Sequence, residues 1–268
     1  MPNVSYERRG AAALLEITRR ERRNAVDEQT AAELLAAYRE FESDEGARAL
    51  VLAGEGPEAF CAGADLKAFA ERAASFSGDD PEEEIGRWLD ERPDGPLGFT
   101  RLQASKPTIA AISGWCLAGG LELALWCDLR IATSHARLGF TERRFGVPLI
   151  DGGTQRLPRI VGTGRALEMI LTGRIVGATD ALAWGLVNEV VAEGAHVERA
   201  LEIAEGLAGF PQRTMLSDRR AALEGLGRPL PDGLELEARL GRASAITGAA
   251  GAARFAAGEG RGAEGAGV

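Results

Sequence analysis

One pattern recurs in the chain: a short apolar strand, a turn of small residues, a helix and a second strand. It occurs around residues 48–70 and again around residues 108–132. In the first copy the strand Arg48–Ala53 leads into a loop of small residues, and in the second the strand Thr108–Ser113 leads into the glycine-rich turn Gly114–Gly120. A strand that returns to its own sheet through a helix crosses over with a right-handed sense. The repeat therefore predicts an α/β fold of stacked turns in a right-handed spiral.

The N-terminal part predicts a β-hairpin followed by a helix. Val4–Arg8 and Ala12–Thr18 have strand character and are separated by Arg9-Gly10, a turn signal. Asp27 can cap a helix that carries apolar residues at helical spacing. Segment 74–96 is rich in serine, aspartate and proline, which predicts a mobile surface segment with a short helix inside it.

The C-terminal part is mostly helical in its apolar periodicity. We expect the last segment, 248–268, to be frayed at its end, because it consists largely of glycine and alanine. The helices predicted before it are Arg165–Leu171, Thr179–Trp184, His196–Leu207, Pro211–Leu223 and Leu234–Ile246.

Composition excludes several classes of protein. The chain has only two histidines, His135 and His196, which argues against a histidine-based metal site. Three cysteines without a CxxC pair indicate reduced thiols and a cytoplasmic protein. The formal charge of −9 argues against a nucleic-acid partner. No stretch approaches the roughly 18 apolar residues of a membrane helix, and residues 1–10 lack the apolar core of a signal peptide.

Two glycine-containing segments can present backbone N–H groups to a ligand. Residues 60–67 follow a strand with small side chains that leave the backbone uncovered. At Gly119-Gly120 a helix begins, and its free N–H groups favour a developing negative charge. Glu122 lies one helical turn beyond Gly119 among apolar neighbours, where a carboxylate is either paired or functional.

A third segment, 138–158, adds two acids. Glu142 ends the stretch Leu138-Gly139-Phe140-Thr141-Glu142, and Asp151 precedes the turn Gly152-Gly153-Thr154 before a helix. Asp151 alone is equally well explained as a helix cap.

Taken together, these segments resemble the crotonase superfamily, the enoyl-CoA hydratases and isomerases. The resemblance runs from Arg23–Ala25 to Gly185–Val191 and covers nearly the whole chain. It implies a spiral of ββα turns with a C-terminal helical oligomerisation region. The spiral core with the CoA and catalytic site would span 1–195, and the helical region with its Gly/Ala-rich tail 196–268. Family members assemble into trimers or dimers of trimers, so we expect a homo-oligomer.

The resemblance also implies an enzyme, an enoyl-CoA hydratase that adds water across the C2=C3 bond of a trans-2-enoyl-CoA. Backbone N–H groups of Ala64 and Gly119 would form the oxyanion hole. Glu122 and Glu142 would hold the water, one as general base and one as general acid. No metal and no cofactor is expected, since coenzyme A is part of the substrate. The residues expected to contact the substrate are Ala62, Asp65, Leu66, Lys67 and Gly120, with Lys67 placed either to meet a phosphate or in solvent.

Departures from the family pattern leave alternatives open. Asp151 adds a third expected catalytic acid, which makes a double-bond isomerase using Glu142 and Asp151 the first alternative. Arg143 or Arg144 could pair with either acid and silence it. A non-catalytic acyl-CoA-binding paralogue is a further alternative, although binding alone requires neither glutamate.

Three further interpretations concern a rival enzyme class, two cysteines and the acyl pocket. A Rossmann dehydrogenase is a weaker rival, because Gly119-Gly120 lacks the G-x-G-x-x-G spacing. Cys61 and Cys116 are interpreted as small packing residues. The candidates for lining the acyl pocket are Trp88, Leu89, Leu97 and Phe99.

Overall fold

Two β-sheets lie at the centre of the computed structural model, which describes residues 2–74 and 80–258. The six-stranded sheet has the order β1-β2-β3-β5-β7-β10, and the four-stranded sheet has the order β4-β6-β8-β9. The strands of the first are β1 (Val4–Arg9), β2 (Ala12–Ile17), β3 (Ala49–Gly54), β5 (Thr108–Ile112), β7 (Leu129–Thr133) and β10 (Glu189–Val191). Those of the second are β4 (Ala59–Cys61), β6 (Trp115–Leu117), β8 (Arg137–Gly139) and β9 (Ile175–Gly177).

The chain passes through the same unit three times, which confirms the predicted spiral. Each turn places one strand in the large sheet, the next in the small sheet, and then a helix: β3-β4-α2, β5-β6-α4 and β7-β8-η2. Here α2 is Leu66–Ala74, α4 is Gly119–Trp126 and η2 is the 3₁₀ helix Thr141–Phe145. The third turn was not predicted, because a three-residue strand followed by a 3₁₀ helix has no clear apolar period.

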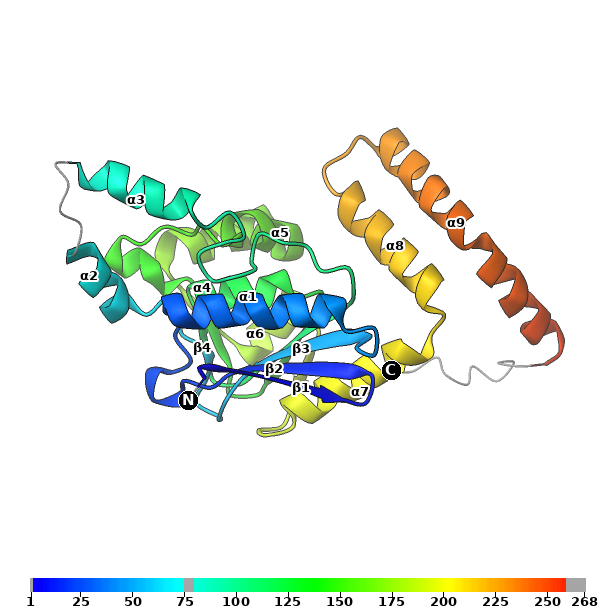
Figure 1. The fold of residues 1–268 in the computed structure, drawn as a ribbon, viewed down its shortest axis with the longest axis horizontal. Coiled ribbons are helices and arrows are strands. Elements are labelled where there is room, and N and C mark those ends of the chain that lie inside the picture. Colours follow the sequence, from blue (N-terminus) through cyan, green and yellow to red (C-terminus); the bar gives the residue numbers. More distant parts are fainter. Residues whose placement is uncertain (1, 75–79, 259–268) are drawn as a thin grey trace.

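Alternation along the large sheet divides its side chains between two cores. Leu50 and Leu52 of β3 face the side covered by α1 (Glu28–Ser43) and by the small sheet. Val51 points to the opposite side and packs under α7 (His196–Gly209). Successive strand residues point to opposite faces, so a strand covered on both sides is apolar throughout. Figure 1 shows α1 and α7 on either side of this sheet.

The hairpin and the first helix agree with their predictions. β1 and β2 pair antiparallel, with Val4 opposite Ile17 at one end and Arg9 opposite Ala12 at the other. Asp27 caps α1 by accepting a hydrogen bond from Thr30 N at 2.8 Å. In segment 74–96 the short helix is α3 (Pro81–Asp90), whereas residues 75–79, part of the segment predicted to be mobile, lie outside the described residues.

Helices follow the third turn as predicted, but the first of them is longer than expected. α6 (Ala178–Ala183) and α7 match their expected ranges. The helix expected at 165–171 is the second half of α5 (Gly153–Thr172), which is interrupted at Gly162 with φ of 77°. None of the helices in the described part of the chain is long and apolar enough to cross a membrane.

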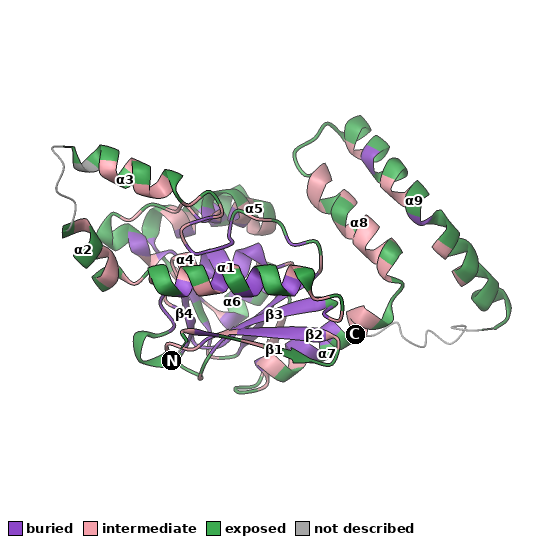
Figure 2. Ribbon diagram, in the orientation of Figure 1, coloured by how far each residue is buried: buried purple, intermediate pink, exposed green. Residues whose placement is uncertain are grey.

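The last two helices form a hairpin that stands away from the sheets (Figure 1). α8 (Gln212–Gly225) and α9 (Leu230–Ala256) pack chiefly against each other, and Figure 2 shows α9 mostly exposed and α8 mostly half-buried. α9 continues through Ala256, so the first part of the tail expected at 248–268 is helical, since alanine is the best helix former. Residues 259–268, where fraying was predicted, lie outside the described residues.

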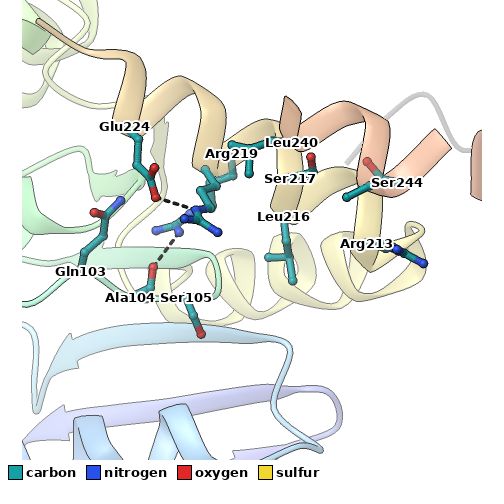
Figure 3. A pocket seen from close by; sticks show the side chains of 12 residues that line it. Gln103, Ala104, Ser105, Arg213, Leu216, Ser217, Arg219, Glu224, Leu240 and Ser244 are labelled. Atoms are coloured by element: carbon teal, nitrogen blue, oxygen red, sulfur yellow. Dashed lines mark hydrogen bonds and ion pairs between the residues drawn. The ribbon is translucent and has the colours of Figure 1, made fainter. Parts of the chain in front are cut away.

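One arginine connects this hairpin to the spiral. Arg219 Nε donates to Asp128 Oδ2 at 2.8 Å. Its Nη1 donates to Ala104 O at 2.7 Å, a bond that Figure 3 shows. Arg219 lines a cavity of about 480 Å³ between α8, α9 and the loop at residues 103–105. The division of the chain at residue 195 stays a prediction.

Candidate active site

The register of the small sheet brings three distant loops to one end. Cys61 of β4 lies opposite Cys116 of β6, which lies opposite Leu138 of β8. Parallel strands in register end together, so the residues that follow them are neighbours. Ala64, Gly119 and Glu142 each come three or four positions after these aligned residues. The candidate site is therefore a consequence of the spiral, with one loop from each turn.

Two backbone N–H groups at this end are free. Among residues 2–74 and 80–258, neither Ala64 N nor Gly119 N has a hydrogen-bond acceptor. Gly63 brings the two loops together: a Cβ built on it would lie 2.9 Å from Gly119 N, and its φ is 90°. A glycine is thus required at position 63 by space and by conformation. Ala118, just before Gly119, also has a positive φ, 53°, and such strain is typical of functional sites.

Glu122 is buried on the first turn of α4 and is held by one of its two oxygens. Its Oε1 accepts hydrogen bonds from Gly153 N at 2.7 Å and from Asp151 N at 3.0 Å. Burial is the main reason that the pKa of Glu122 rises to about 8, with the nearby charges of Asp151 and Glu142 adding to the effect. The two backbone N–H donors fix the position of the carboxyl group, and neither of them carries a charge that could pair with it.

Glu142 on η2 is buried and has no such support. Within the described part of the chain, neither of its carboxylate oxygens has a hydrogen-bond partner. Burial raises the pKa of Glu142, and the nearby charge of Arg143 lowers it by less. Arg143 Nε donates instead to Ile170 O at 3.3 Å. The prediction that Arg143 or Arg144 silences Glu142 by pairing is therefore wrong.

Asp151 is the third buried carboxylate, and its side chain is hydrogen-bonded to the loop 94–101. Asp151 Oδ1 accepts hydrogen bonds from Leu97 N at 3.2 Å and from the Thr100 hydroxyl. Burial raises the pKa of Asp151, against the effect of these donors. Since these are its partners, silencing of Asp151 by Arg143 or Arg144 is wrong as well.

All three carboxylates face one cleft with a volume of about 670 Å³. Ala64, Gly119 and the predicted acyl-pocket residues Trp88, Leu89 and Leu97 line the same cleft. Trp88 is fixed there because its Nε1 donates to Glu28 Oε1 at 3.0 Å.

The fourth acyl-pocket candidate, Phe99, was wrongly assigned to the cleft. Its side chain is fully buried in the core, where its ring stacks on Tyr38 at 5.4 Å between centroids and contacts Trp126. Sequence alone could not distinguish the two directions available to residues 97 and 99, because the loop that carries them has no regular period.

Comparison with known proteins agrees with this arrangement. The family model "Enoyl-CoA hydratase/isomerase" matches residues 7–247. The chain belongs to the enoyl-CoA hydratase/isomerase family. Among curated relatives, the short-chain-enoyl-CoA hydratase of Clostridium acetobutylicum is 35% identical over 239 residues, which are 88% of this chain and 86% of the relative.

Solved structures of the family show the same fold. The enoyl-CoA hydratase EchA1 from Mycobacterium marinum superimposes with a TM-score of 0.83 at 31% identity, and 96% of each chain is covered. The enoyl-CoA hydratase from Bacillus anthracis gives a TM-score of 0.80 at 34% identity, with 90% of each chain covered. The α/β spiral with C-terminal helices is thereby confirmed as the fold of this family.

The residues expected to contact substrate differ in their positions. Ala62, Asp65 and Leu66 line the cleft, but the Asp65 carboxylate is already bound by Arg19 Nη2 at 3.1 Å. Lys67 is exposed on α2 and is not among the described residues that line the cleft, so its contact with a phosphate stays a prediction.

Gly120 has a packing requirement that the motif did not predict. A Cβ on it would lie 2.1 Å from the carbonyl oxygen of Cys61. Cys61 and Cys116 are buried, as expected of packing residues, and burial raises the pKa of Cys61 to about 12. A thiolate there is too scarce to serve as a nucleophile near neutral pH.

Two residues that support the family's site were missed by sequence reasoning. Thr100 and Arg156 both contact the segment around Asp151. Thr100 lies in the loop that has no regular period. Arg156 comes three positions after Gly153, so its closeness to that turn in the sequence was the one available signal.

Proposed function

We propose that the protein is an enoyl-CoA hydratase that adds water across the C2=C3 bond of a trans-2-enoyl-CoA. One observation carries this proposal: two buried glutamates, Glu122 and Glu142, line the same cleft as the two free N–H groups of Ala64 and Gly119. Backbone donors and a pair of acids in one cavity are what the addition of water to a thioester-activated double bond requires.

The two N–H groups act on the thioester. They donate to its carbonyl oxygen, and this oxygen becomes negative when the oxygen of water bonds to C3 and an enolate forms. Donors fixed in advance stabilise such an oxyanion by roughly 3 kcal/mol each. Gly119 N lies at the start of α4, where the helix dipole adds to the effect.

The two glutamates act on the water. Glu122 is held through Oε1, and no described residue bonds either oxygen of Glu142, so both can bind a water molecule. One carboxylate accepts the proton of the attacking water, and the other carboxyl group delivers a proton to C2. Their charges interact, so the two groups titrate as a pair and share the acid and base roles. The reaction calls for no cofactor besides the CoA of the substrate.

Hydration of crotonyl-CoA, followed by loss of the enoyl absorbance, tests this function. Glu122→Gln and Glu142→Gln are each expected to lower kcat by about 10²–10⁴-fold, the usual contribution of a general acid or base. Glu202→Gln is the matched control, because Glu202 is an exposed carboxylate on α7 that pairs with Arg199. The proposal fails if the wild type hydrates crotonyl-CoA and both active-site variants keep the full rate.

A double-bond isomerase is the second candidate, because Asp151 lines the same cleft. It would use Glu142 and Asp151 to move a proton between carbon atoms. An enzyme that isomerises 3-enoyl-CoA or 3,5-dienoyl-CoA but leaves crotonyl-CoA unchanged establishes this candidate instead.

We further propose that the protein is a homo-oligomer, a trimer or a dimer of trimers. The supporting observation is the α8–α9 hairpin, which exposes Leu230, Leu234, Ile246 and Phe255. Exposed apolar side chains on one element mark an interaction surface. Light scattering on the purified protein measures the assembly directly, and a monomer at micromolar concentration contradicts it.

The three separate reduced cysteines support a cytoplasmic location.

A further inference from the structure

Asp151 occupies an unusual position between two walls of the cleft. Its backbone N–H donates to Glu122 Oε1 at 3.0 Å. Its side chain accepts from Leu97 N at 3.2 Å and from the Thr100 hydroxyl. A single residue therefore joins the glutamate on α4 to the loop 94–101, which arrives from a different turn of the spiral.

The loop on the far side of Asp151 bears on the oxyanion donors. The Leu97 side chain lies over Gly119, because a Cβ built on that glycine would be 2.5 Å from Leu97 Cδ1. Leu97 lines the cleft as well. A displacement of the loop 94–101 would therefore change the packing over Gly119 as well as the part of the cleft that Leu97 lines.

The surroundings of Asp151 are built to hold it in this place. Arg156 Nη1 donates to Asp151 O at 2.8 Å, and its Nη2 donates to Thr100 O at 2.5 Å. The guanidinium thereby spans the same two segments from behind. Gly95 leaves room for the carboxylate, because a Cβ there would lie 3.2 Å from Asp151 Oδ1 and closer still to the Thr100 hydroxyl.

We propose that Asp151 is a positioning residue of the hydratase, which acts by clasping the loop 94–101 to the turn that holds Glu122. This inference rests on the proposed function. Asp151 Oδ1 accepts hydrogen bonds in this clasp and does not exchange protons with the substrate. The clasp fixes the positions of Glu122, Gly119 and Leu97 relative to one another. A misplacement of reacting groups by about 1 Å can lower the rate by about 10²-fold.

Two substitutions, Asp151→Asn and Asp151→Ala, distinguish this positioning role from proton transfer. In Asp151→Asn, Oδ1 can still accept from Leu97 N and Thr100, whereas no carboxyl group remains to titrate. We expect Asp151→Asn to hydrate crotonyl-CoA with a kcat within about threefold of wild type, and Asp151→Ala to lose about 10²-fold in kcat with a smaller change in KM. Equal losses in the two variants would assign a proton-transfer role and overturn the proposal.

Thr100→Val tests the clasp from its other side. The substitution removes the hydroxyl donor and keeps the shape of the side chain, so it is expected to lower kcat in the direction of Asp151→Ala. Because both changes break one connection, the double variant should be no slower than Asp151→Ala alone. Additive losses would overturn the proposal. Asp94→Ala is the matched control, since Asp94 lies in the same loop but pairs outward with Arg39 at 3.1 Å.

Hydrogen exchange gives a readout that is independent of hydration. The amide of Leu97 should exchange at least tenfold faster in Asp151→Ala and Thr100→Val than in wild type, and at nearly the wild-type rate in Asp151→Asn. Unchanged exchange in all three variants would overturn the clasp even if the enzyme is a hydratase. Accelerated exchange in a protein that does not hydrate crotonyl-CoA would instead support the clasp and contradict the proposed function.

Discussion

The buried carboxyl group of Glu122 predicts an unusual dependence of stability on pH. Its pKa in the folded protein is about 8, against 4.5 for an ordinary glutamate. Between these values the folded chain keeps a proton that the unfolded chain has lost. Stability therefore falls as pH rises through this window, the reverse of what a salt-bridged acid produces.

Replacement of Glu122 by glutamine removes this dependence. The amide oxygen can still accept from Gly153 N and Asp151 N, and the side chain has no proton to lose. One pKa unit corresponds to 1.36 kcal/mol, so the rise from 4.5 to about 8 gives an upper bound of roughly 5 kcal/mol. Glu122→Gln should match wild type near pH 4 and exceed its free energy of unfolding by roughly 3 kcal/mol at pH 7.

Urea unfolding followed by tryptophan fluorescence measures this difference, since the chain has four tryptophans. The protein concentration must be the same in every sample, because association stabilises the folded state. Glu202→Gln on the exposed face of α7 is the control and should follow wild type at every pH. A difference between Glu122→Gln and wild type that stays constant from pH 5.5 to 8.5 would show that Glu122 does not keep its proton in the folded protein.

Three further predictions use the same unfolding assay. Gly120→Ala should lower the free energy of unfolding by about 3 kcal/mol, because its Cβ would lie 2.1 Å from a backbone oxygen; an unchanged urea midpoint contradicts this. Ala118→Gly should raise it by about 1 kcal/mol by relieving a φ of 53°, and a loss of stability would show that no strain is stored there. Burial lowers the pKa of His196, so stability should fall as pH drops below about 6.5, where the unfolded chain binds the proton first. His196→Asn should flatten that slope between pH 7 and 5, and an unaltered slope would rule His196 out as its source.

The large sheet and most helices could be predicted because their apolar residues repeat over enough length. β3 and β5 are continuous apolar runs, and α7 carries a helical period, so local pattern and tertiary burial agree. The strands of the small sheet are three residues long, too short for any period to appear. Their existence depends on partners in other turns of the spiral, and those partners are set by register alone.

The candidate site, like the fold, could be predicted from the sequence only in part. The sequence by itself determined which residues could carry the chemistry, because glycines before a helix and acids at Glu122 and Glu142 stand in a specific order. Only the tertiary structure decided how deeply each acid is buried and which hydrogen bonds it accepts. Burial left Glu142 without a hydrogen-bond partner among the described residues, the turn at Gly153 supplied donors to Glu122, and the Thr100 hydroxyl bonded Asp151. A side chain's direction and desolvation depend on neighbours from other turns of the spiral, and these neighbours are absent from any local stretch of sequence.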